Sequence, residues 1–168
     1  VAFTSYASDI TDLGSGFNTP NVFVHQISSG STDFITKDFE NGKASGGSAP
    51  SISENGKSIA FYSNNHRLVE NDNNKLWDIF LWKNGNVKRI SVPNSGMERN
   101  QGNESTSRIV YPSISGDGEK VVFATTSSTL VENDTNTFQD IFLYDIRNSS
   151  LKRISTLENN AESNGDSP

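Results

Sequence analysis

LVENDNNKLWDIFLW, at residues 68–82, is the most informative stretch of this chain, because it returns as LVENDTNTFQDIFLY at residues 130–144. The two stretches lie 62 residues apart, and the same spacing separates Pro50 from Pro112. The duplication therefore extends beyond the quoted stretch and stays in register. Repetition at a period of this size indicates supersecondary units that stack on one another.

A third, more diverged copy opens the chain. VAFTSYA at residues 1–7 matches IAFYSNN and VVFATTS of the two later copies, and Asn21 of this first copy stands in the place of Asp78. We therefore predict one domain, residues 1–168, built of three repeats at about residues 1–49, 50–111 and 112–168.

Each complete repeat predicts four short β-strands. In the second repeat these are expected at residues 51–53, 57–62, 77–82 and 87–92. Asn-Gly and Asp-Gly turns join alternating runs, as in β-hairpins, and no stretch has helical periodicity. The third strand is apolar at consecutive positions, which predicts a sheet covered on both faces, and the polar fourth strand, with its Lys and Arg, predicts an exposed sheet edge.

These features predict an all-β fold of β-propeller blades, each a sheet of four antiparallel strands. The chain starts within a second strand, so it holds three repeats less one strand. Because propellers usually have about 4 to 8 blades, we expect either a partial ring or half of a six-bladed ring that self-association with a second chain closes.

Composition narrows the function classes. The net charge is −6, so we expect no nucleic-acid partner. Only 32% of the residues are apolar, which suits flat sheets packed face to face better than a single large core. No apolar run approaches the roughly 20 residues that a transmembrane helix needs, so we expect no membrane insertion. The chain has no cysteine, which excludes disulfides and thiolate metal sites.

The sharpest candidate site is a spacing of Asp, Asn and Asp that two repeats share. Calcium takes six to eight oxygen ligands, which carboxylates and amides on a loop that enters a strand could supply in part. The loops lack the Gly and Glu of an EF-hand, and Asp and Asn also cap turns by accepting bonds from main-chain N–H groups. We therefore expect no cofactor other than calcium. The candidate calcium ligands are Asp72, Asn74, Asp78, Asp134, Asn136 and Asp140.

Catalytic chemistry finds little support in the sequence. His25 and His66 fall at non-equivalent places, there is no G-x-S-x-G motif, and carboxylate pairs such as Glu70 with Asp72 recur in both matching repeats. A catalytic pair on a propeller is instead expected once, in loops that differ between blades. We therefore predict no catalytic residue and no enzymatic activity. Trp77 has Gln in its place in the third repeat, so it is free to contact a ligand.

The motifs resemble those of a known family. P-S-I-S-x-x-G, then L-V-x-x-D-x-N-x-x-x-D-I-F, then K-R-I-S are similar to the WD40-like (PD40) propeller repeat of TolB-type proteins, and the resemblance covers essentially the whole chain. It implies a bacterial periplasmic or extracellular setting. The function expected is a non-catalytic binding or scaffold module that recognises a protein or polysaccharide through propeller loops or a channel. The alternatives are a carbohydrate-active propeller enzyme, a hydrolase or lyase, and a calcium-stabilised surface module.

Overall fold

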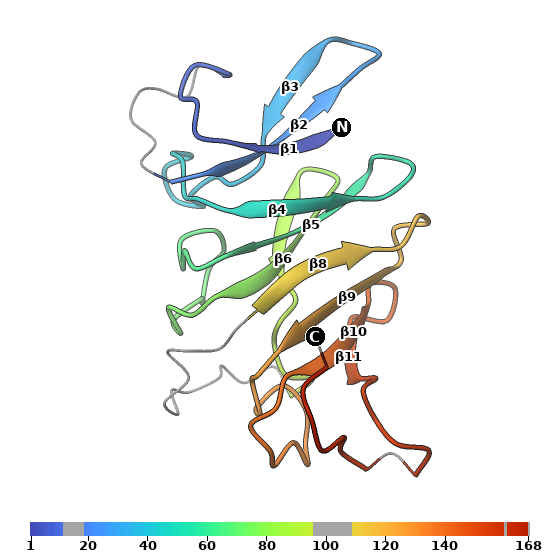
Figure 1. Ribbon diagram of the computed structural model, residues 1–168. Coiled ribbons are helices and arrows are strands. Elements are labelled where there is room, and N and C mark those ends of the chain that lie inside the picture. Colours follow the sequence, from blue (N-terminus) through green and yellow to red (C-terminus); the bar gives the residue numbers. More distant parts are fainter. Residues whose placement is uncertain (12–18, 96–108, 160, 168) are drawn as a thin grey trace.

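The structure is a computed structural model that describes residues 1–11, 19–95, 109–159 and 161–167 (Figure 1). This part of the chain contains no helix, and its strands form three antiparallel sheets. The first sheet holds β1 (Ala2–Ser5), β2 (Asn21–Gln26) and β3 (Ser31–Phe34). The second holds β4 (Ser48–Ile52), β5 (Ser58–Ser63), β6 (Asp78–Lys83) and β7 (Asn86–Arg89). The third holds β8 (Ile109–Ile114), β9 (Lys120–Thr125), β10 (Asp140–Asp145) and β11 (Ser150–Arg153).

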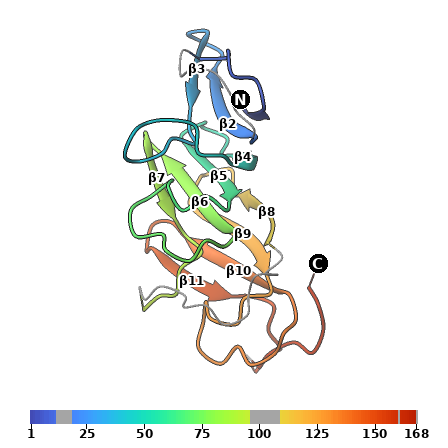
Figure 2. The same cartoon turned by 90° about the vertical axis from the view of Figure 1, so that its left-hand side faces the viewer.

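Each sheet is a meander in which consecutive strands are neighbours. The three sheets stack in chain order, with β1, β4 and β8 near one another and β3, β7 and β11 at the other edges (Figures 1 and 2). None of the sheets closes on itself. The all-β class predicted from the sequence is confirmed, and the arrangement fits part of a propeller.

Tight turns set the strand register. Gly56 and Gly118, at equivalent places, both have φ of 70°, a left-handed conformation that glycine adopts without steric cost. Asn84 and Gly85 also have positive φ, as an Asn-Gly hairpin turn requires. The β-hairpins predicted at these positions are present.

A phenylalanine pair recurs across the second and third strands of each repeat. The ring centroids are 5.5 Å apart for Phe3 and Phe23 in the first sheet. They are 5.6 Å apart for Phe61 and Phe80 in the second. Phe123 and Phe142 form the matching pair in the third sheet, at 5.9 Å. The three sheets therefore share one cross-strand aromatic contact at equivalent positions.

The apolar cores lie between adjacent sheets. Phe61 and Phe80 of the second sheet pack on Val22 and Ile35 of the first. In the same way, the phenylalanines of the third sheet pack on Ile79, Leu81 and Ile90 of the second. One aromatic face against one aliphatic face is therefore the packing rule at both boundaries.

The third sheet has an aliphatic face that no described sheet covers. Four consecutive residues from the start of β6 are buried, whereas buried and half-buried residues alternate along β10. Ile90 is 0% exposed, but its third-sheet equivalent Ile154 is 41% exposed. The prediction of two covered faces thus holds for the second sheet and is wrong for the third, because no further sheet packs on it.

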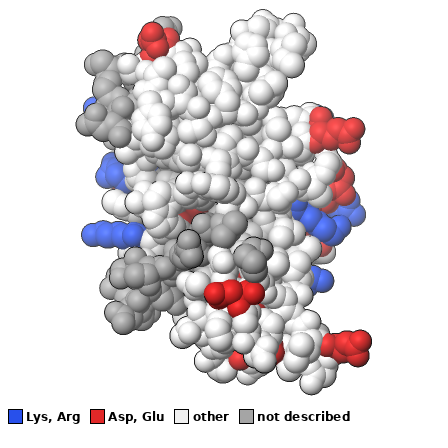
Figure 3. Space-filling view, in the orientation of Figure 1, with Lys and Arg blue, Asp and Glu red and all other residues white. Residues whose placement is uncertain are grey.

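The structure also shows how charge is distributed on one face and whether a helix could span a membrane. On the face shown in Figure 3, most charged side chains lie toward the margins, and an acidic group lies below the centre. No helix among the described residues has the length and apolar character that a membrane span requires.

Candidate functional site

The predicted metal ligands of the second sheet surround an arginine. Nη1 of Arg89 lies 2.6 Å from Oδ1 of Asp72 and 3.5 Å from Oδ2 of Asp78. The side chains of all three residues are almost completely buried. A buried carboxylate is stable as a charge only with a partner, and the guanidinium is that partner here.

The Asp78 carboxylate of this cluster has two further local partners. Nδ2 of Asn74 donates to Oδ2 of Asp78 over 2.9 Å, and Oγ of Ser91 donates to the other carboxylate oxygen over 2.5 Å. Asn74 also accepts a bond from the main-chain N–H of Leu76 at 2.8 Å. Asn74 thus caps its turn, as the structural alternative expects.

The third sheet repeats the cluster and enlarges it. Nη1 of Arg153 lies 3.4 Å from Asp134, 3.1 Å from Asp140 and 3.1 Å from Glu162. Burial opposes the charge on Arg153, but its hydrogen bonds to Glu162 and Asp140 outweigh this effect and raise its pKa. The pKa of Glu162 is lowered most by the hydrogen bond that it accepts from the main-chain N–H of Thr135. The Thr135 hydroxyl and Arg153 lower this pKa to a smaller extent.

The amide of the third-sheet loop is used differently. Nδ2 of Asn136 donates to the main-chain oxygen of Ser163 over 3.2 Å, and its Oδ1 accepts from the N–H of Phe138 at 2.8 Å. Asn136 therefore fastens the C-terminal segment to the loop. The loop also receives a bond from that segment, where the N–H of Ser167 donates to the main-chain oxygen of Gln139 at 2.8 Å.

The first sheet lacks both the acid and the arginine. Oδ1 of Asn21 accepts from Oγ1 of Thr36 at 2.9 Å and from the N–H of Gly46 at 3.0 Å. Phe34 takes the place of the arginine and packs against Phe23, with ring centroids 5.4 Å apart. The sequence predicts no metal in this repeat. The prediction rests on Gly14, Gly16 and Asn21, which stand in the places of Asp72, Asn74 and Asp78. Positions 14 and 16 lie outside the described residues.

A guanidinium thus occupies the space between the acids in both later sheets. Within the described part of the chain, no group of three or more His, Cys, Asp or Glu side chains is arranged to hold a metal ion. Calcium at the six predicted residues stays a prediction. The sequence analysis did not identify Arg89 and Arg153 as partners of the acids. A signal was present, because the first repeat replaces both the arginine and the aspartate, with Phe34 and Asn21.

The fourth strand also differs from expectation. β7 is an edge strand, but its Arg89 points inward to the acidic cluster. Lys88 reaches the next sheet, where Nζ donates to the hydroxyl of Tyr144 at 3.0 Å and to that of Ser149 at 3.2 Å. The two basic side chains that predicted a solvated edge therefore stabilise the sheet and its boundary.

Three aromatic side chains gather on the surface at the boundary of the second and third sheets. Tyr62 of β5 lies between Trp77 and Tyr111, with ring centroids 5.0 Å and 5.6 Å away. Trp77 is 42% exposed and Tyr111 is 66% exposed. We call these three residues the aromatic patch. The sequence singled out Trp77 alone.

The aromatic patch is not part of the repeated pattern. Trp77 is replaced by Gln139 in the third repeat, and Tyr62 by Ala124. Tyr111 corresponds to Ala49 one repeat earlier. These aromatic residues were a detectable signal, because a repeated residue serves the shared fold whereas an unrepeated exposed one is free to serve a ligand.

The structure places the two histidines and the paired acids in different surroundings. His25 is on β2, where its Nδ1 lies 2.9 Å from the hydroxyl of Thr32. His66 is exposed in the loop after β5. Asp72 is bonded to Arg89, whereas Glu70 is exposed.

Comparison with known proteins gives structural neighbours only. No family model matches the chain, and no curated protein matches it. TolB from Acinetobacter baumannii is similar over 85% of this chain and 28% of its own length, at 23% identity and a TM-score of 0.45. A protein assigned as TolB from Agrobacterium tumefaciens is similar over 80% of this chain and 40% of its own length, at 19% identity and a TM-score of 0.45. The chain thus spans less than half the length of either neighbour. Both are TolB proteins, the family whose repeat the motifs of this chain resemble.

Proposed function

We propose that this chain is a non-catalytic recognition module, and that it binds a protein or polysaccharide at the aromatic patch. The observation that carries the proposal is the gathering of Trp77, Tyr62 and Tyr111 from three separate segments onto one exposed surface. Trp and Tyr bury large areas with few rotatable bonds, so they dominate the energetics of recognition surfaces. Their ring faces also stack on the apolar C–H faces of sugar rings.

The buried ion pairs favour a structural rather than a catalytic role for the repeated acidic residues. An acid that works in catalysis needs a proton-transfer partner in the substrate, whereas Asp72 and Asp78 are buried against Arg89. The alternative of a carbohydrate-active hydrolase or lyase requires a pair of carboxylates at an accessible place. The alternative of a calcium-stabilised surface module requires a cation to replace Arg89 or Arg153.

The third repeat provides the substitutions that test the aromatic patch. Trp77→Gln and Tyr62→Ala introduce the residues that the third repeat already carries there, so the fold should tolerate them. On arrays of oligosaccharides and of peptides, we expect each variant to bind at least about tenfold more weakly than the wild type, which corresponds to about 1.4 kcal/mol. Phe138→Leu is the control, since it replaces another exposed aromatic residue with its second-repeat equivalent.

Wild-type binding that both patch variants retain would contradict the proposal, as would equal losses in Phe138→Leu. A chain that binds nothing on either array would also contradict it.

We further propose that the chain is one domain of three propeller repeats, and that a second copy completes the ring. The open aliphatic face of the third sheet supports this, because Ile154 is 41% exposed whereas its second-sheet equivalent Ile90 is buried. Both interior boundaries bury an equivalent aliphatic face under an aromatic one. The first sheet of a second copy would offer an aromatic face with Phe3. The setting that we propose, from the family resemblance, is periplasmic or extracellular.

A further inference from the structure

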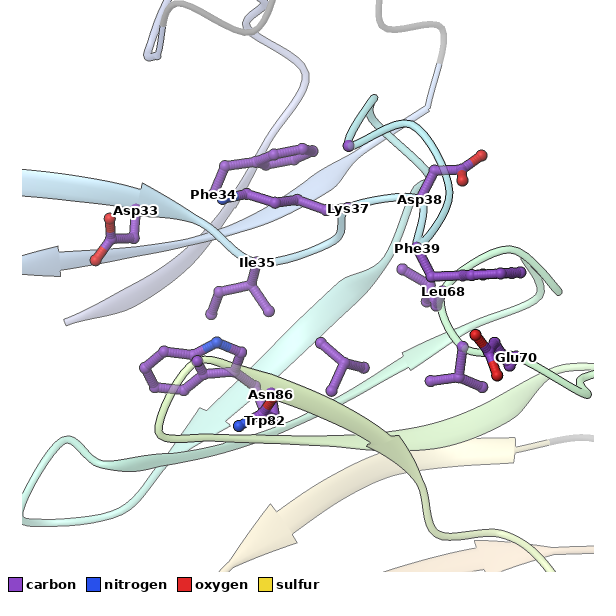
Figure 4. Close-up of a pocket in the computed structure, with 14 residues that line it drawn as sticks. Asp33, Phe34, Ile35, Lys37, Asp38, Phe39, Leu68, Glu70, Trp82 and Asn86 are labelled. Carbon is purple, nitrogen blue, oxygen red and sulfur yellow. The ribbon is translucent and has the colours of Figure 1, made fainter.

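A cleft separates the outer edges of the first and second sheets. It has a volume of about 680 Å³ and lies between β3 and β7 (Figure 4). Its apolar lining includes Ile35 of the first sheet and Leu68 and Trp82 of the second. Asp33 and Glu70 are exposed acids at its two ends. The cleft is separate from the aromatic patch and uses none of its residues.

Open space continues from this cleft along the outer side of β7. A second cavity of about 310 Å³ shares Val87 with the cleft and extends past Lys88 and Arg89 to Val92. The two cavities together follow β7 over most of its length. A ligand that fills both would therefore have to be extended.

The strand register shows which main-chain groups of β7 face this space. The N–H of Ile90 donates to the main-chain oxygen of Ile79 at 2.8 Å, so alternate residues of the strand bond to β6. Val87 lies three residues before Ile90, so its N–H and C=O point away from β6. No described residue forms a hydrogen bond with these two groups of Val87. An edge strand with an unpaired donor and acceptor is a template for another strand.

At the boundary of the second and third sheets, a side chain of the protein itself forms hydrogen bonds with the equivalent main-chain N–H and C=O. There the equivalent of Val87 is Leu151, on the outer strand of the third sheet. Nδ2 of Asn94 donates to the main-chain oxygen of Leu151 at 2.7 Å, and the N–H of Leu151 donates to Oδ1 of Asn94 at 2.8 Å. One carboxamide thus takes the place of a neighbouring strand.

The equivalent position of the first repeat does not hold a carboxamide. Asn94 follows Ser91 by three residues, and Phe39 follows Thr36 by three. The two hydroxyl residues are equivalent, since each accepts a bond from the main-chain N–H of the residue after Asn21 or Asp78. Phe39 therefore stands in the position of Asn94. Its ring lines the cleft, is 45% exposed and cannot form these bonds.

We propose that this cleft binds an extended peptide segment of a partner protein, which adds to the edge of β7 and pairs its main chain with Val87. An apolar side chain of the peptide fits the lining of Ile35, Leu68 and Trp82, and basic side chains complement Asp33 and Glu70. Addition of a strand to a sheet edge is a general mode of peptide recognition, with affinity from the main chain and specificity from side-chain pockets.

The test uses a defined peptide and the amide signal of Val87. The probe is acetyl-Lys-Val-Thr-Val-Thr-Lys-amide, titrated into the uniformly ¹⁵N-labelled chain and followed by NMR. We expect saturable shifts of the Val87 amide with a Kd of about 1 mM or tighter. The same peptide methylated at alternate main-chain nitrogens, which removes the donors on its pairing edge, should not shift this amide.

Two matched variants test the position of the site. Phe39→Asn installs the carboxamide of the next boundary, so it should close the edge and weaken peptide binding at least about tenfold. Glu158→Asn places a carboxamide at the equivalent position of the third sheet, three residues after Ser155. This position lies outside the cleft, so the variant should leave binding unchanged.

Three results would overturn the proposal. Shifts that persist with the methylated peptide would exclude strand pairing. Shifts of the Trp82 indole with chitohexaose, in the absence of any peptide effect, would make the cleft a sugar site. No response to either probe would remove the site. Because the aromatic patch is tested by Trp77→Gln, none of these results bears on the proposed function.

Discussion

Phe34 of the first sheet occupies the position that Arg89 occupies in the second, since Phe34 lies opposite Phe23 in the strand register and Arg89 lies opposite Phe80. The first sheet also begins β2 with Asn21 in place of an aspartate. Acid and base are therefore present together or absent together. A metal site would require only the acids, whereas an ion pair requires both members.

Calcium should leave the stability of the wild-type chain unchanged. A cation at Asp72 and Asp78 would have to displace the Arg89 guanidinium from a buried position. We therefore expect the thermal midpoint to differ by less than about 1 °C between excess calcium and excess chelator, because a ligand stabilises only the state that it binds. Differential scanning calorimetry measures this directly. A rise of several degrees with calcium would support the calcium-stabilised alternative.

Asp38, in the loop after β3, forms an ion pair with Arg67, in the loop after β5. This ion pair should make stability depend on pH at acidic values. The hydrogen bond from Arg67, together with bonds from the main-chain N–H groups of Glu40 and Asn41, lowers the pKa of Asp38, although desolvation opposes the shift. The folded-state pKa thus lies below the unfolded value of about 4. This contribution is fully present above the unfolded pKa and is lost as pH falls through the folded one.

Removal of the arginine should shift the Asp38 titration upward. In Arg67→Met we expect the pKa of the Asp38 carboxyl to rise toward the unfolded value, as measured by carbon-detected NMR. Asp117 is the internal control, because the hydroxyl of Ser115 and the N–H of Glu119 lower its pKa independently of Arg67. An Asp38 titration that is the same in both proteins would contradict the assignment of Arg67 as the cause.

Loss of the Asn94 carboxamide should loosen the outer strand of the third sheet. Asn94→Ala removes two hydrogen bonds to Leu151, each with a net contribution of about 0.5–1.5 kcal/mol. We expect a loss of about 1–2 kcal/mol in the free energy of unfolding, together with faster hydrogen exchange at the Leu151 amide. Asn94→Asp, which keeps the acceptor and loses the donor, should be intermediate. Unchanged exchange at Leu151 would show that the bonds contribute nothing.

Self-association should depend on the open face of the third sheet. If a second copy covers this face, light scattering should give twice the 18.3 kDa mass of one chain. Ile154→Lys places a charge on the face and should give a monomer, whereas Ile27→Lys, at a residue that is 76% exposed in the turn after β2, should not. A wild-type monomer at all concentrations would contradict ring completion by a second copy.

The sequence predicted the features that the repeat itself encodes. Phe80 and Phe142 recur at one spacing, and the structure places both in the core. The turns at Gly56 and Gly118 could be predicted because local chemistry determines them. Features that depend on a single repeat, or on contacts between sheets, were harder to predict.

Two misses illustrate this limit. Lys-Arg in a polar strand suggested a solvated edge, and only the strand register shows that Arg89 points toward Asp72. Tyr62, Trp77 and Tyr111 lie in different segments of the chain, so sequence proximity gives no sign that they meet. Their absence from equivalent positions in other repeats was the available signal.

The free energy of unfolding of Arg89→Ala, from urea denaturation, tests most directly whether the repeated acids build the fold. The variant leaves Asp72 and Asp78 buried without their cation, so we predict a loss of about 3–5 kcal/mol. The control is Arg147→Ala, which removes an exposed pair with Glu119 and should cost less than about 1 kcal/mol. Equal small losses in the two variants would contradict the account.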